Sequence, residues 1–180
     1  MKKIILLAIA FTFVNVLVAQ TNKGDWMVGG AFNLNTSGNN TVIALSPNAG
    51  TFIIDNLALG ANIGLEYRKT GDLKVTSFGI GPWLRYYFTE ANVRPILQGN
   101  FNFLSATTKS NGFKDNNTGT NYFLGGGAAI FLSDHVSLDM LMGYDHTKLN
   151  GADAKGGFAL KIGFQVYLHR PQVERLRGRQ

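Results

Sequence analysis

Four charged side chains are the first candidates for chemistry, because each stands in a stretch of apolar and small residues: Glu66, Arg85, Asp139 and Lys161. Two carboxylates and two cations can neutralise one another as ion pairs or can line a path for ions. Asp139 and Lys161 fall on consecutive predicted strands, where a diagonal approach is expected if the register allows it. We interpret the four as a charge network in a barrel interior, with gating of a narrow pore as the alternative.

The histidines are the candidates for acid–base catalysis: His135, His146 and His169. Of the three, only His146 follows an acid, Asp145, beside a segment expected to face the outside. Such a pair resembles the surface sites of barrel acyltransferases or proteases, which place histidine and acidic or serine residues at the outer rim, but no particular serine accompanies it. We therefore predict no catalytic residues. The histidines and acids also lack the spacing of metal ligands, and the glycines at 125–127 lack the lysine of a phosphate loop, so we predict no metal and no cofactor.

The segment 158–168, FALKIGFQVYL, shows how these charges would be positioned. Its alternate residues are all bulky and apolar, and the residues between them are small or polar, so an extended strand would send one set to each face. Eleven residues is also the length with which a tilted strand crosses the hydrocarbon layer of a membrane, roughly 9 to 11 residues. The apolar set comprises Phe158, Leu160, Ile162, Phe164, Val166 and Leu168.

The same alternation predicts seven further strands and hence an even count, which brings both ends of the chain to one side of the membrane. They cover residues 26–34, 41–53, 57–68, 77–88, 93–103, 122–132 and 136–145. Short turns near Asp55, Glu90 and Asp134 are expected to face the periplasm, and longer polar breaks near Ser37, Gly71, Lys114 and Gly151 the exterior. The longest predicted break is 107–118.

The sizes of the side chains separate a membrane barrel from a water-soluble, lipocalin-like barrel. Glycines and amides dominate the less apolar face, which fits a cramped interior better than a hydrated exterior. Charged residues make up only 16% of the chain, against ~25% in soluble domains. We therefore predict an all-β fold: a closed, antiparallel, up-and-down transmembrane β-barrel of about eight strands.

The ends of the chain predict three regions. Residues 1–19, with Lys2 and Lys3 before an apolar run and Ala19 after it, read as a cleavable signal peptide; the alternative is a membrane anchor, for which the run is short. Residues 20–168 form the barrel. Residues 169–180 are a basic periplasmic tail, either solvated or a docking segment for an anionic partner. The charge of +6 is concentrated in the two ends, so no basic footprint for nucleic acid is expected in the barrel.

The whole pattern resembles the small eight-stranded OmpA/OmpX-like outer-membrane barrels, and in particular the glycine-rich outer membrane β-barrel proteins of Bacteroidota. The resemblance rests on the hairpin 50–60 and on Lys161, Gly163, Val166 and Leu168, which match the terminal-strand signal read by the barrel assembly machinery. Two departures are that this strand is not terminal and that Val166 and Leu168 stand where aromatics are commoner.

The resemblance implies a location in the bacterial outer membrane, a monomer, and outer-membrane lipid and the barrel assembly machinery as partners. We expect a non-enzymatic structural or surface-interaction protein that meets an extracellular partner through its loops, foremost the segment 109–118. A narrow passive pore is the alternative, and a lipid-modifying enzyme is the second alternative.

Overall fold

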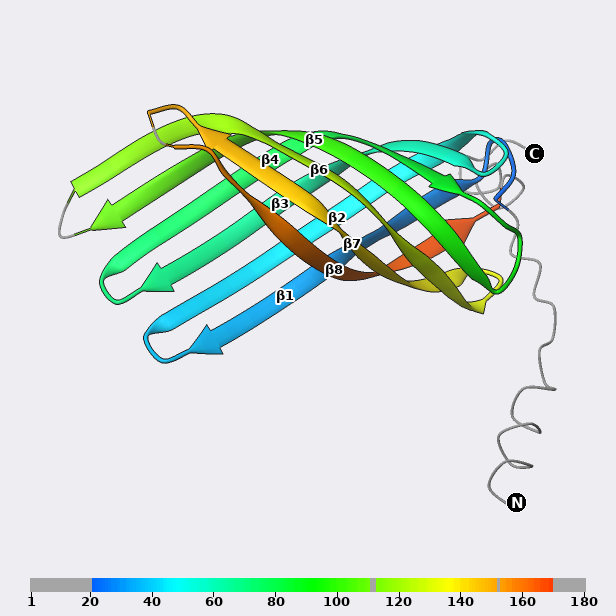
Figure 1. Cartoon of the computed structure of the whole chain (residues 1–180), viewed down its shortest axis with the longest axis horizontal. Helices are drawn as coiled ribbons and strands as arrows, with labels where there is room; N and C mark the ends of the chain where they lie inside the picture. The colour runs from blue at the N-terminus through cyan, green and yellow to red at the C-terminus, as the bar shows by residue number, and fades with distance from the viewer. Residues whose placement is uncertain (1–20, 111–112, 152, 170–180) are drawn as a thin grey trace, which may run out of the picture.

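The computed structural model describes residues 21–110, 113–151 and 153–169. Eight antiparallel strands each pair with the next along the chain, and the last pairs with the first, which closes the barrel (Figure 1). The predicted all-β closed barrel is therefore confirmed. The strands are β1 (Trp26–Ser37), β2 (Asn40–Ile54), β3 (Leu57–Thr70), β4 (Leu73–Tyr87), β5 (Val93–Ser110), β6 (Phe113–Ser133), β7 (Val136–Leu149) and β8 (Lys155–Leu168).

The two ends of the barrel differ in their connections. At one end, which we call the turn end, the connections are 55–56, 88–92 and 134–135, and β1 begins and β8 ends there. The tight turn at 55–56 is made by Asn56, whose φ of 63° lies in the left-handed region that asparagine tolerates. At the other, the hairpin end, four two-stranded hairpins extend side by side (Figure 1).

The prediction of long polar loops at the hairpin end is wrong. The segment 107–118 belongs almost entirely to strands, because β5 and β6 stay in register as far as Ser110 and Phe113. The Thr107 hydroxyl even donates to the Asn116 side chain across this hairpin, at 2.8 Å. Apolar residues alternate along a strand only where its outer face contacts lipid. Backbone pairing can continue into water through polar residues, so the strands extend beyond the end of the apolar pattern.

The outer and inner faces have the residues that the alternation predicts for them. Apolar side chains form a wide exposed band around the barrel, far larger than the patches that soluble monomers expose. The band includes Val28, Phe32, Ile43, Leu45, Leu59, Ile63, Leu65, Phe78, Ile80, Leu84, Tyr86, Leu97, Phe101, Phe103, Tyr122, Leu124, Leu132, Met140, Met142, Tyr144, Phe158, Leu160, Ile162, Phe164 and Val166. Such a surface is stable in hydrocarbon rather than in water.

The predicted signal peptide, 1–19, and nearly all of the predicted tail, 170–180, lie outside the described residues, so both stay predictions. Of the tail only His169 is described, and its Nδ1 lies 3.4 Å from a carboxylate oxygen of Asp25 at the turn end. No helix among the described residues is long and apolar enough to cross a membrane.

Candidate functional site

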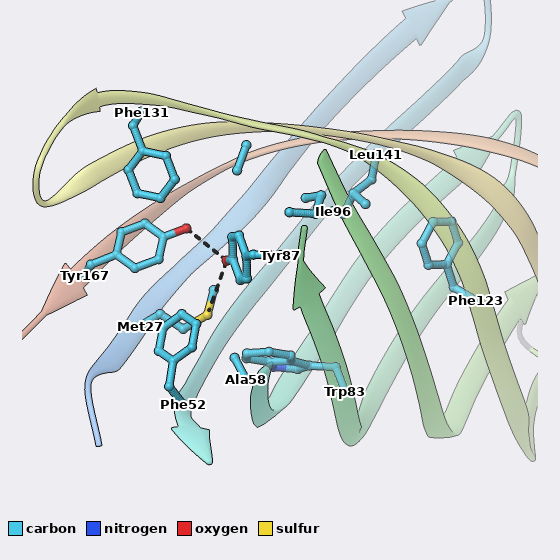
Figure 2. Close-up of a cluster of buried hydrophobic side chains, with 11 residues drawn as sticks. Met27, Phe52, Ala58, Trp83, Tyr87, Ile96, Phe123, Phe131, Leu141 and Tyr167 are labelled. Atoms are coloured by element: carbon cyan, nitrogen blue, oxygen red, sulfur yellow. Dashed lines mark hydrogen bonds between the residues drawn. The ribbon is translucent and has the colours of Figure 1, made fainter. Parts of the chain in front are cut away.

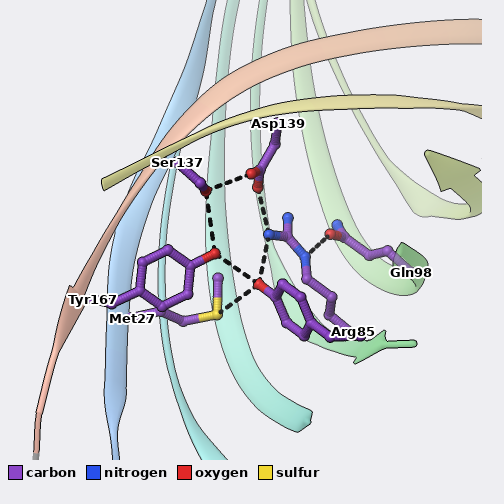
Figure 3. A network of polar contacts seen from close by, with 7 residues as sticks. Met27, Arg85, Gln98, Ser137, Asp139 and Tyr167 are labelled. Atoms are coloured by element: carbon purple, nitrogen blue, oxygen red, sulfur yellow. Dashed lines mark hydrogen bonds and ion pairs between the residues drawn. The ribbon is translucent and has the colours of Figure 1, made fainter. Parts of the chain in front are cut away.

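An ion pair crosses the barrel interior toward the turn end. A guanidinium nitrogen of Arg85, on β4, lies 2.5 Å from a carboxylate oxygen of Asp139, on β7, and both side chains are almost fully buried (Figure 3). Arg85 also donates to Gln98 at 2.7 Å, and Ser137 donates to the other oxygen of Asp139 at 2.7 Å. A buried ion pair is tolerated when its remaining donors and acceptors are also satisfied, which is the case for these contacts.

Two tyrosines join this ion pair to an apolar cluster. The hydroxyls of Tyr87 and Tyr167 are 3.0 Å apart, and Arg85 donates to the Tyr87 hydroxyl at 3.2 Å. Both rings pack against Phe52, with ring centroids at 5.7 and 6.4 Å, and Tyr167 also packs against Phe131 at 4.9 Å (Figure 2). Side chains from β1, β2, β4, β6 and β8 thus fill the same section of the interior.

A second buried arginine closes the interior at the turn end. Arg94, on β5, is fully buried and donates to the carbonyls of Ala91 and Glu90 and to the Thr21 hydroxyl. Its guanidinium lies 4.4 Å from the centre of the Phe131 ring, within cation–π range. Arg94 was not among the predicted network residues, although its inward position in the alternation marks it as an interior charge. Its main partners are backbone carbonyls, which no residue pattern reveals.

Lys161 and Asp139 are diagonal neighbours, as the expectation required, but the ion pair of Lys161 is with another acid. Asp139 lies opposite Gly163 in the β7–β8 register, and Lys161 lies opposite Leu141. Lys161 pairs with Asp145, which is four residues beyond Leu141 toward the hairpin end; the two charged atoms are 3.0 Å apart and both side chains are partly exposed. Its ammonium lies 3.8 Å from the centre of the Phe123 ring, and Asp145 also accepts a hydrogen bond from Asn121.

Glu66 does not reach the other three members of the predicted network. Its carboxylate pairs with Arg68 on the same strand, at 3.0 Å, near the hairpin end, and both side chains are exposed. The four predicted charges therefore belong to three separate ion pairs, two of which are completed by residues outside the predicted network. Only Arg85 and Asp139 contact each other.

Asp145 and His146, the candidate catalytic pair, have their side chains on opposite faces of β7. Asp145 faces the interior, whereas His146 faces outward and stacks on Tyr122, with ring centroids 4.8 Å apart. Adjacent residues on a strand point to opposite faces, so this acid cannot orient this base. Within residues 21–110, 113–151 and 153–169, no group of three or more histidines and acids is placed to hold a metal ion.

The residues of the predicted assembly signal lie on the strand that closes the barrel. Leu168 pairs with Trp26, and Val166 pairs with Val28 on one side and with Val136 on the other. Lys161 and Gly163 lie on the same strand, on the inner face. Recognition of these residues by the assembly machinery stays a prediction.

Comparisons with known proteins agree with this architecture. Residues 4–167 match the family model described as "Outer membrane protein beta-barrel domain". No curated protein matches the sequence. Similar solved structures are neisserial surface protein A (20% identity, 79% of this chain and 94% of that one, TM-score 0.56), the N-terminal β-barrel domain of Pseudomonas aeruginosa OprF (14%, 83% and 99%, 0.53) and the attachment invasion locus protein Ail of Yersinia pestis (13%, 81% and 99%, 0.53).

At these identities the structural similarity shows the fold. The family match covers most of the chain, including every strand except the last residue of β8. With its closed strand order, apolar exterior and polar interior, the chain belongs to the outer membrane protein β-barrel domain family and is an eight-stranded barrel of the bacterial outer membrane.

Proposed function

We propose that this barrel is a non-enzymatic, monomeric structural or surface-interaction protein with a closed interior, whose hairpin end faces the outside of the cell. The observation that carries the proposal is the buried Arg85–Asp139 pair together with the aromatic cluster beside it. Outer-membrane lipid and the barrel assembly machinery are its proposed partners, as for other barrels of this location.

A closed interior argues against the alternative of a passive pore. An eight-stranded barrel has space for side chains and little more. Here Tyr87, Tyr167 and Phe52 are fully buried against one another, and Arg94 lies beside Phe131 nearer the turn end. An ion would have to displace two layers of packed side chains.

The hairpin end offers the surface for a partner. The β5–β6 hairpin continues its strand pairing through polar residues as far as Ser110 and Phe113, which makes it a β-hairpin projection rather than an irregular loop. One similar structure, Ail, is named as an attachment and invasion protein, which supports a contact role for this end. Barrels of this class carry their longer extensions on the outer side of the membrane, and β5 and β6 continue through polar residues beyond the apolar band only at the hairpin end, which supports placing the turn 55–56 in the periplasm.

Planar-bilayer recording tests the closed interior. We expect no steady conductance from the purified barrel, and we expect the double variant Tyr87→Ala/Tyr167→Ala to conduct if it folds, as judged by its heat-modifiable gel mobility. Steady conductance of the unmodified barrel, altered by Lys161→Met, would favour the pore instead.

Cysteine labelling tests the orientation, and the absence of cysteine from the chain makes the experiment clean. A membrane-impermeant maleimide should label Asn116→Cys, on the β5–β6 hairpin, in intact cells. The matched variant Asp134→Cys, in a connection at the turn end, should react only after the outer membrane is opened. Labelling of Asp134→Cys but not of Asn116→Cys in intact cells would mean that the turn end faces the outside.

A further inference from the structure

Four lysines form one continuous row across four adjacent strands at the hairpin end. Lys69 on β3 pairs in register with Lys74 on β4, Lys74 with Lys109 on β5, and Lys109 with Lys114 on β6. All four are exposed. Each is an even number of residues from an outward aromatic of its own strand, so all four belong to the outer face of the barrel.

The row has no counter-charge of its own. Like charges directly opposite each other on paired strands are destabilising, and here three such pairs follow one another. In the described part of the chain no carboxylate lies within ion-pair distance of any of the four. The nearby Glu66 carboxylate is paired with Arg68, and Asp115, opposite Thr108 on the inner face, accepts a hydrogen bond from Asn117.

The position of the row indicates what supplies the missing charge. On β3, Lys69 is two residues beyond Tyr67, so it stands at the edge of the apolar band. On β5, Lys109 is six residues beyond Phe103, so the row continues outward from that edge. Its four side chains span about 14 Å, given ~4.8 Å between neighbouring strands. The stems of lysines at such an edge lie along apolar surface while the ammonium groups reach polar headgroups.

We propose that the row formed by Lys69, Lys74, Lys109 and Lys114 binds phosphate groups of the phosphorylated glycolipid of the outer leaflet. The inference rests on the proposed orientation, which places the hairpin end in that leaflet. Lysines are compact point charges that suit phosphate. Each lysine of the row is the second residue from the hairpin end of its strand, and the row lies on the outer face and starts two residues beyond Tyr67, where it meets lipid headgroups; charges in the mouth of the barrel would instead meet a soluble polyanion.

The test measures binding of phosphorylated lipid A to the full barrel in a neutral detergent by native mass spectrometry. Dephosphorylated lipid A serves as the matched probe. We expect the barrel to prefer the phosphorylated form, and the preference to fall by about fivefold for each lysine removed, hence roughly 25-fold for Lys74→Gln/Lys109→Gln. Excess inorganic phosphate should compete poorly, because it lacks the acyl chains that hold the headgroup at the edge of the band.

The matched control removes two lysines away from the row. Lys23 is exposed at the turn end, and Lys155 is exposed on the inner face of β8, so Lys23→Gln/Lys155→Gln changes the net charge equally and should keep the preference. Heat-modifiable mobility verifies that each variant folds. The row variant should also unfold no more readily than the unmodified barrel in neutral detergent, because it loses only repulsion.

Three results would overturn the proposal: equal binding of both lipid A forms, an equal loss in the control variant, or tighter binding of soluble heparin than of lipid A through the same lysines. The last result would assign the row to a soluble polyanion. Binding of purified lipid does not depend on which way the barrel points in the cell, so a failure of the orientation would be seen separately in the cysteine labelling.

Discussion

Arg85 and Asp139 contact each other across the interior from β4 and β7, strands that are separated along the wall by β5 and β6. The two residues are 54 positions apart in the chain and share no backbone pairing. Their contact is therefore a property of the closed barrel: it forms only when the wall curves enough to bring one side of the interior to the other. The pair also connects, through Tyr87, to the aromatic cluster near the turn end.

Removing Arg85 should destabilise the barrel strongly. Arg85→Met leaves the Asp139 carboxylate buried without its cation, which costs about 3 to 5 kcal/mol in comparable cases. Urea unfolding from lipid vesicles, followed by tryptophan fluorescence, measures the change. The double variant Arg85→Met/Asp139→Leu is the control, since it removes both charges and should recover most of the loss. Equal stability of Arg85→Met and the unmodified barrel would mean that the pair is not buried in the membrane.

Removing Lys161 should matter much less. Its ion pair with Asp145 is partly exposed toward the hairpin end, and pairs of that kind contribute about 1 kcal/mol or less. The contact with the Phe123 ring adds roughly 0.5 to 1 kcal/mol. In the same unfolding experiment, Lys161→Met should therefore have a clearly higher free energy of unfolding than Arg85→Met. A loss as large as that of Arg85→Met would return Lys161 to the centre of a single network.

Ile162 tests the lipid-facing side. It is exposed on the outer face near the middle of β8, so Ile162→Arg should reduce the free energy of unfolding in vesicles by about 2 to 4 kcal/mol. Ile162→Leu, which keeps the apolar surface, should change it by much less. A silent Ile162→Arg would show that the two faces of β8 are exchanged.

Gly50 tests the packing of Trp83. The indole lies over Gly50 and Gly60, and a Cβ added at Gly50 would come within 2.5 Å of a ring carbon. Gly50→Val should cost about 1 to 3 kcal/mol of stability, as overpacked interiors do. Gly64, whose Cβ position is open, provides the matched control: Gly64→Val should be tolerated far better. Equal effects of the two substitutions would mean that the indole is free to move.

The sequence could predict the face of the sheet to which each charged side chain points, but it could not predict the register between strands, which decides which charges meet. The inward direction of Arg85, Asp139 and Lys161 followed from alternation and was right, because a strand leaves a side chain only two choices. Which of them meet depended on the stagger between neighbouring strands and on the width of the interior. Alternation carries neither quantity, so it predicted neither the ion pair of Lys161 with Asp145 nor the contact of Arg85 with Asp139 across the interior.

The sequence by itself determined that eight alternating segments present apolar residues to one side and small or polar residues to the other, because a strand repeats its facing every two residues. Tertiary structure decided where the strands end and which side chains contact each other in the interior. Backbone pairing continues beyond the lipid into polar residues, which turned the segment 107–118 from a loop into a hairpin. Closure of the wall brought Arg85 to Asp139, and the register of β3 to β6 aligned the four lysines, because only strand pairing places distant residues side by side.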